Sequence, residues 1–238
     1  MENATYVAIT RQTGLLAEMQ AIANNIANSS TTGFRKEGVI FSEYVKDLER
    51  DEPSLSMARA SGRMIDLSQG ALASTGGTFD FAIEGPGFFM LATPTGNQLT
   101  RAGAFALGPD GSLLSADGFQ LLDVGGAPIQ IDPAQGPIGV AQDGTVDSGG
   151  VPVAQIGLFL PAQPGELARA AGTRFRIAGD PLPADGAKIL QGFLENSNVN
   201  PVSEITRMIE VQRAYELGQA FLDREDARIR GVIQAMAR

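Results

Sequence analysis

Carboxylates supply most of the chemistry open to this chain, because its 238 residues include no histidine and no cysteine. Without histidine the commonest general base and most zinc sites are absent, and without cysteine there are no disulfides or thiolate metal sites. Asp80 and Glu84 could form the acid/base pair of a glycosidase. On a strand they would lie about 13 Å apart, which is wider than either glycosidase geometry. We therefore expect both to be solvated on the outer face of a strand.

Four aspartates that precede a glycine could belong to calcium loops: Asp110, Asp117, Asp143 and Asp185. A calcium loop needs several oxygen ligands at fixed offsets, whereas each of these stands nearly alone beside a glycine that a tight turn requires. The glycine-rich run at residues 85–87 is not followed by a helix carrying lysine or a hydroxyl residue, so it predicts a turn and not a phosphate-binding loop. We expect no catalytic, metal or cofactor site.

Composition argues against several other classes of protein. The formal net charge is −9, and no basic patch is present to neutralise phosphates, so we expect no nucleic-acid partner. Hydrophobic residues make up 43% of the chain, which is too many for a disordered protein. The N-terminal region lacks the basic start and continuous apolar run of a secretory signal peptide, and no apolar stretch is long enough to predict a membrane span.

The strongest periodic pattern of the chain lies at its C-terminal end, in residues 200–238. Apolar residues there are spaced alternately three and four apart, with gaps only at Gly218 and Glu225. They are Met208, Val211, Tyr215, Leu222, Ile229, Val232 and Met236. This heptad spacing predicts one helix of roughly 50 Å with a coiled-coil face. We expect Ser203 to cap its first turn.

A second helical pattern lies near the N-terminus, over residues 4–28. Four apolar residues repeat the same spacing: Leu15, Met19, Ile22 and Ile26. Asparagines at its end weaken the helix, and the polar run that finishes at Gly33 terminates it. The simplest way to bury both apolar seams is to pair the two terminal helices with each other.

The middle of the chain is rich in glycine and proline and has strand-like alternation. Phe79, Phe81 and Ile83 alternate with polar or small residues, and Asp-Gly and Gly-Gly pairs recur at short intervals. Such a pattern is typical of an antiparallel β sandwich or barrel. Residues 162–171 are compatible with either one helical turn or a loop.

The stretch between the N-terminal helix and this β-rich region has no strong period. It includes a charged run at residues 46–52 and a Ser/Ala-rich run at 53–62, so we expect an extended linker. The predicted fold class is α+β, with long N- and C-terminal helices paired as a coiled coil and an antiparallel β-rich domain inserted between them. The expected parts are an N-terminal helix in residues 1–33, a linker in 34–77, a β-rich outer domain in 78–190 and a C-terminal helix in 191–238.

Two helices alone leave much of each apolar stripe exposed, so we expect further helical partners from outside the chain. Nine seam residues are candidates for this assembly interface: Leu15, Met19, Ile22, Ile26, Met208, Val211, Tyr215, Leu222 and Ile229. The alternative is that the seams form only an internal core. Gly218 costs about 1 kcal/mol relative to alanine in a helix, so its presence in the seam suggests close approach of another backbone.

Stretches spread along the chain, in the right order, resemble the signatures of the bacterial flagellar rod and hook family of axial proteins. They are IANNIANSSTTGFR at residues 22–35, DFAIEGPGFF at 80–89, TRAGAF at 100–105 followed by Asp-Gly at 110–111, LENSNVN at 194–200 and MIEVQRAYE at 208–216. These matches are long and specific, and they span most of the chain.

The resemblance implies a structural subunit that assembles helically through its terminal helices into the drive shaft of the flagellar basal body. The implied partners are other copies of the chain, neighbouring rod proteins and the flagellar type III export apparatus, with no cofactor, small-molecule substrate or nucleic acid. Export through that apparatus needs no cleavable signal. Within the family, subunits of the proximal rod resemble the chain most.

Alternative interpretations remain open from the sequence. A distal rod subunit is the nearest rival, and a hook-like subunit would normally carry a larger β insertion. Two less favoured readings are a β-sandwich hydrolase that uses aspartate or glutamate and a β-rich extracellular binding module with oligomerising helices. The lack of histidine and cysteine and of any carboxylate cluster argues against the hydrolase.

Overall fold

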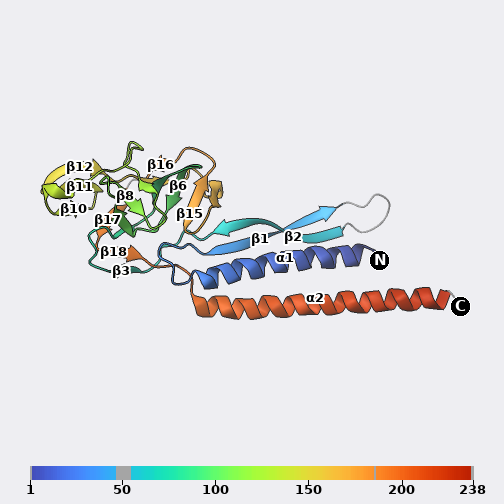
Figure 1. Ribbon diagram of the computed structural model, residues 1–238. Coiled ribbons are helices and arrows are strands. Elements are labelled where there is room, and N and C mark those ends of the chain that lie inside the picture. Colours follow the sequence, from blue (N-terminus) through green and yellow to red (C-terminus); the bar gives the residue numbers. More distant parts are fainter. Residues whose placement is uncertain (1, 47–54, 185, 237–238) are drawn as a thin grey trace. The chain divides into compact units, whose positions relative to one another are not determined.

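The computed structural model describes residues 2–46, 55–184 and 186–236 (Figure 1). The chain divides into two compact units. Unit 1 comprises Met1–Ala27, Glu37–Asp66 and Asn200–Arg238, and unit 2 comprises Asn28–Lys36 and Leu67–Val199. The N- and C-terminal helices are in contact and the region between them is rich in antiparallel strands, which confirms the predicted α+β class.

Unit 1 is built on a pair of antiparallel helices. Helix α1 (Glu2–Ala27) packs against α2 (Pro201–Met236) and also against the hairpin of β1 (Glu37–Lys46) and β2 (Leu55–Ile65). Figure 1 shows α1 lying between the hairpin and α2, with the start of α1 and the end of α2 at the same end of the pair. Among the described residues, neither helix has a stretch long and apolar enough to cross a membrane.

The cap of α2 differs from the one that the sequence predicted. The Asn200 side-chain oxygen accepts hydrogen bonds from the backbone N–H groups of Val202 and Ser203, at 3.1 and 3.2 Å. Asn200 is therefore the N-cap, and the choice of Ser203 was wrong. The helix begins earlier than expected because Pro201 is well suited to a first helical position, where its missing N–H is not needed.

A long antiparallel hairpin occupies the region for which we expected an extended linker. Residues 37–46 pair with residues 55–65, with one irregularity after Ile40. The helix provides space for this hairpin at Gly14, where an added Cβ would lie 2.7 Å from the Phe41 ring. Contact with α1 thus favours pairing in a segment with no local period. Most of the charged run at residues 46–52 lies outside the described residues.

Unit 2 consists of short strands, and every described strand pair is antiparallel. The strands are β3 (Leu72–Ser74), β4 (Phe81–Glu84), β5 (Phe88–Thr93), β6 (Gly96–Thr100), β7 (Phe105–Leu107), β8 (Leu113–Ser115), β9 (Gln120–Leu121), β10 (Ile138–Val140), β11 (Thr145–Ser148), β12 (Val151–Gln155), β13 (Leu158–Leu160), β14 (Leu167–Arg169), β15 (Arg174–Ile177), β16 (Leu182–Pro183), β17 (Lys188–Gln191) and β18 (Phe193–Glu195). A nine-stranded sheet contains the order β14-β15-β6-β5-β9-β8-β7, with β13 paired to β5 and β16 paired to β13. Residues 162–171, which the sequence left open, form a 3-10 turn (Pro164–Glu166) followed by β14.

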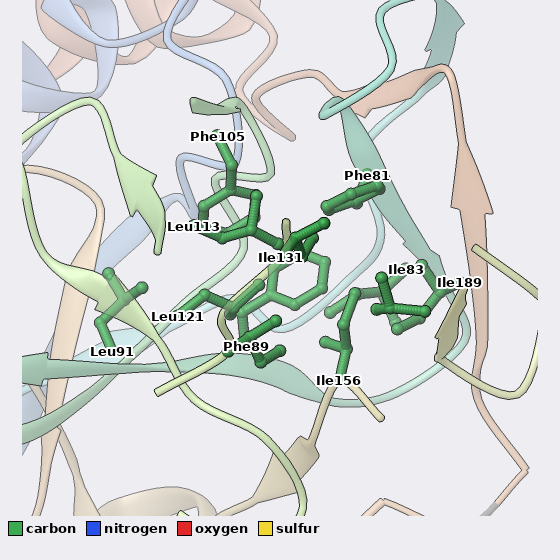
Figure 2. Packing of buried hydrophobic residues seen from close by; sticks show 12 residues of the cluster. Phe81, Ile83, Phe89, Leu91, Phe105, Leu113, Leu121, Ile131, Ile156 and Ile189 are labelled. Carbon is green, nitrogen blue, oxygen red and sulfur yellow. The ribbon is translucent and has the colours of Figure 1, made fainter. Parts of the chain in front are cut away.

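The core of unit 2 is aromatic and aliphatic. Phe81 and Phe89 are fully buried, and each lies within 6 Å of the Phe105 ring centroid, at 5.8 and 5.5 Å. Figure 2 shows these side chains directed toward one another together with Leu121, Ile131 and Ile156. The alternation of Phe81 and Ile83 in the sequence correctly predicted the strand β4 and its place in this core.

Tight turns occupy the described Asp-Gly positions, as the sequence predicts. Gly111, Gly118 and Gly144 have φ of 80°, 81° and 87°, which glycine adopts without strain. The Asp110 and Asp143 carboxylates accept hydrogen bonds from the backbone N–H two residues on, as expected of turn-forming aspartates. Among the described residues no cluster of acidic side chains could hold a metal ion.

Both edges of the three-stranded sheet β10-β11-β12 are protected. The Gln191 carboxamide accepts from the N–H of Val140 at 3.0 Å and donates to the carbonyl of Ile138 at 3.2 Å, so it occupies the edge of β10 as a neighbouring strand would. On the opposite edge strand, Pro152 has no N–H to offer.

Candidate assembly interface

The heptad seams of the two helices meet inside unit 1. Leu15, Ile22 and Val211 are buried against one another, with at most 9% of each residue exposed. Partly buried apolar residues surround them: Met19, Ile26, Met208, Ala214 and Tyr215. Seam residues from both helices thus pack within one chain.

The last two candidate residues, Leu222 and Ile229, do not belong to this buried cluster. Leu222 is half-buried, whereas Ile229 is 45% exposed. Both belong to the C-terminal half of α2. Their apolar surface is available for contacts that residues such as Val211 cannot make.

Sequence reasoning missed a further set of exposed apolar residues on α2. They are Val202, Ile205, Ile209, Leu217, Phe221, Val232, Ile233 and Met236, with 43 to 82% of each residue exposed. Val232 and Met236 belong to the heptad pattern but are not among the nine interface candidates. The others fall outside the seam, so a search for one stripe passes over them, and only a second apolar face on the same helix would have revealed them.

A buried polar junction joins the ends of three elements in unit 1. Asn25, near the end of α1, donates to the backbone carbonyl of Glu37 at 2.8 Å and to the Glu204 carboxylate at 2.9 Å. Its side-chain oxygen accepts from the backbone N–H of Glu37 at 2.9 Å. Each of these three residues is at most 3% exposed. The polar groups satisfy one another, which is the condition for burying them without a large penalty.

An ion pair on the surface of the helix pair adds to this junction. Arg207 of α2 donates to the Glu18 carboxylate of α1, with an Nη2–Oε1 distance of 2.7 Å. The hydrogen bond to Glu18 is the main reason why the pKa of Arg207 is raised. Because the Arg207 side chain is 55% exposed, solvent screens this pair and its contribution to stability is small.

A second buried cluster, in unit 2, brings together charged residues from three of the sequence stretches noted above. Glu195 forms ion pairs with Arg35 at 2.7 Å and with Arg101 at 3.0 Å, and it accepts from the N–H of Gly70 at 2.7 Å. All three charged side chains are at most 3% exposed. Burial lowers the pKa of Arg101 to about 10, and Glu195 partly offsets this effect, so Arg101 is protonated at neutral pH.

The carboxylates considered for acid/base chemistry are separate from both clusters. Asp80 lies just before β4 and accepts a hydrogen bond from the Thr75 hydroxyl at 2.6 Å, whereas Glu84, at the end of the same strand, is exposed. Thr75 orients one of the two carboxylates, and solvent surrounds the other.

Three family models match successive parts of the chain. They are described as flagella basal body rod protein (residues 6–35), flagellar hook protein FlgE/F/G D1 domain (82–148) and flagellar basal body rod FlgEFG protein C-terminal (190–234). The first model covers most of α1 and the stretch that follows it, and the last covers most of α2 and the stretch that precedes it.

Full-length relatives carry the same descriptions. The chain is 38% identical to the flagellar basal-body rod protein FlgF of Caulobacter vibrioides, over 100% of this chain and 99% of that protein. It is 40% identical to FlgF of Mesorhizobium japonicum, over 91% and 90% of the two chains. Identity to the rod protein FlgG of Bacillus subtilis is lower, at 29% over 95% of this chain and 96% of that protein.

Proposed function

This chain belongs to the FlgF family of flagellar basal-body rod proteins, and from that premise we propose that its paired terminal helices carry the contacts by which copies assemble helically into the rod. As a rod subunit it has a structural and not an enzymatic role. The proposed interface comprises Leu15, Met19, Ile22, Ile26, Met208, Val211, Tyr215, Leu222 and Ile229.

The observation that carries this proposal is the amount of apolar surface exposed on α2. Side chains such as Leu217, at 74% exposed, and Ile233, at 60%, are unusual on the surface of a protein that remains alone. Within the proposed interface the buried residues, such as Val211, hold α2 in place. Leu222 and Ile229 then contact neighbouring subunits.

We further propose that the neighbours are other copies of this chain and other rod proteins, in the proximal part of the rod. A contact that joins different surfaces of successive copies, without closing into a ring, produces a helical shaft. We also propose delivery by the flagellar type III export apparatus, without a cleavable signal peptide. The FlgF relatives support the rod as the location.

Replacing Leu222 with aspartate tests the interface. We expect Leu222→Asp to abolish incorporation into isolated basal bodies, because it places a charge in a contact that must exclude water. Unit 2 should remain folded, as judged by the dispersion of its amide resonances in the purified chain.

The matched control is Gln219→Asp, which places the same charge on an exposed residue of the same helix. This variant should enter the basal body normally. Normal incorporation of Leu222→Asp, or equal failure of both variants, would contradict the proposed interface.

A further inference from the structure

The apolar seam between α1 and α2 does not by itself fix how the two helices are aligned along their axes. Beyond Tyr215, α2 continues the same spacing with Leu222 and Ile229. A shift by seven residues would therefore place Tyr215 and Leu222 where Met208 and Tyr215 now lie, although Gly218 would take the place of Val211. In such repeating interfaces the register is commonly set by polar residues inside the seam.

Two polar residues of α1 are buried in the helix pair. Asn25 makes the three hydrogen bonds described above with Glu37 and Glu204. Gln12, at 8% exposed, donates to the backbone carbonyl of Tyr215 at 2.8 Å. Within the described part of the chain the Gln12 side-chain oxygen has no hydrogen-bond partner.

The space for Gln12 comes from the gap in the α2 seam. An added Cβ on Gly218 would lie 2.5 Å from the Gln12 Nε2 atom, so a larger residue there would displace the amide. Gly218 thus accommodates the side chain of Gln12 in this register. The glycine that interrupts the heptad pattern has a partner within the same chain.

A one-heptad shift would break the polar contacts between the two helices. With Asn25 now level with Glu204 and Gln12 with Tyr215, the shift would bring Asn25 opposite Val211 and Gln12 opposite Leu222. Asn25 would lose the Glu204 carboxylate while keeping its bonds to Glu37, and Gln12 would meet the Glu225 side chain in place of Gly218. A buried amide that loses a partner is unfavourable, as is a larger side chain in the space that Gln12 occupies, so both changes oppose the shifted register.

We propose that Gln12 and Asn25 are positioning residues that fix the register of α1 against α2. The register determines how far α2 extends beyond α1, and therefore which apolar residues of α2 are left without α1 beside them. One consequence rests on the proposed function: through the register, these two residues decide which surface of α2 is available to a neighbouring subunit.

Spin labels measure the register directly in the full-length chain, which has no cysteine of its own. Ala23→Cys and Ala227→Cys place labels on exposed residues of α1 and α2. In the register described here the labels are separated by about 30 Å along the helix axes, at 1.5 Å per residue. Double electron–electron resonance should give one population near this separation in the chain with native Gln12 and Asn25.

In the Gln12→Leu/Asn25→Leu double variant we expect a second population, displaced by about 10 Å, the length of one heptad. Gln20→Leu with Gln219→Leu is the control, because both residues are exposed and the population should stay single. A single, unshifted population in the folded double variant would overturn the proposal and leave the chain connections as the source of register.

If the double variant does not fold, the same distance measurement on the Gln12→Leu single variant tests the proposal. A second population supports the proposal, and an unshifted single population, whatever the change in Tm, overturns it. Register is measured on dispersed chains and incorporation on isolated basal bodies. A shifted register with normal incorporation would therefore reject the proposed interface and leave the positioning role intact.

Discussion

Glu195 is the single residue on which the charged interior of unit 2 depends. One carboxylate faces two guanidinium groups, from Arg35 and Arg101, with almost no exposure to water. Arg101 has further acceptors in the carbonyls of Ile83 and Gly85, at 3.3 and 2.7 Å. The arrangement holds residues from distant parts of the sequence at one point.

Removing this negative charge should destabilise the protein strongly. We expect Glu195→Gln to lower the free energy of unfolding by about 3–5 kcal/mol, because two buried guanidinium groups lose their counter-charge. Chemical denaturation of the purified chain measures the change. Glu84→Gln, on an exposed side chain, should alter it by no more than about 0.5 kcal/mol. Similar values for the two variants would argue against a role for the buried charge.

The turn aspartates make stability depend on acidic pH. Hydrogen bonds from Ser112 lower the pKa of Asp110 below its ordinary 3.8, and those from Thr145 do the same for Asp143. A carboxylate with a lowered folded pKa stabilises the protein above the unfolded value and loses that contribution as pH falls through the folded value.

Thermal unfolding between pH 6 and pH 2 should therefore show a fall in Tm below about pH 4 that is shallower in Asp110→Asn/Asp143→Asn. Asp180→Asn, for which no such hydrogen bond is described, is a suitable control. An identical slope in the double variant and the native chain would show that these two turns do not contribute.

Among the elements, the terminal helices were the easiest to predict, because their pattern is local. The 3,4 spacing identified the seam residues Leu15, Ile22 and Val211, and the structure buries all three. The β1–β2 hairpin was not predictable in this way. Its strands pair with each other across residues 47–54 and pack on α1, so the information lies in long-range contacts and not in the period of residues 34–77.

The polar contacts of the candidate interface were equally hidden from sequence reasoning. Asparagine near residue 25 predicted only the end of a helix, whereas in the structure Asn25 joins α1 to β1 and α2. Likewise, the family motifs are recognisable in the sequence, but nothing in them indicates that Arg35, Arg101 and Glu195 contact one another in the fold. Such meetings depend on the complete tertiary fold.

Within unit 2, the segment 28–36 passes very close to another part of the backbone at Gly33. Gly33 has φ of +69°, and an added Cβ would lie 2.2 Å from the backbone nitrogen of Ala102. We expect Gly33→Ala to lower the Tm well beyond the effect of Gly118→Ala, since Gly118 has a similar φ of +81° but open space around it. Calorimetry of both variants separates the steric from the conformational effect, and equal losses would contradict the close contact.

At the scale of the whole molecule, unit 2 extends beyond its strands to include a segment from the N-terminal part of the chain. Residues 28–36 belong to it although they lie far from its strands in sequence, because Phe34 and Arg35 are at most 1% exposed and Arg169 lies 4.3 Å from the Phe34 ring centroid. The β-rich domain expected at 78–190 left these residues out.

Fragments test this boundary. We expect residues 28–199 to fold cooperatively, whereas residues 67–199 should melt at a clearly lower temperature, since this shorter fragment lacks Phe34 and Arg35. Circular dichroism during heating compares the two. Equal melting temperatures would show that the segment 28–36 is only attached to unit 2 and does not contribute to its stability.

The protection of both edges of the three-stranded sheet matters for a subunit of the flagellar rod, where many protein molecules lie close together. Gln191 occupies one margin with its carboxamide, and Pro152 leaves a gap in the donor row of the other. An open margin at high local concentration invites strand-by-strand fusion of adjacent molecules. Both features disfavour such pairing between the sheets of adjacent molecules.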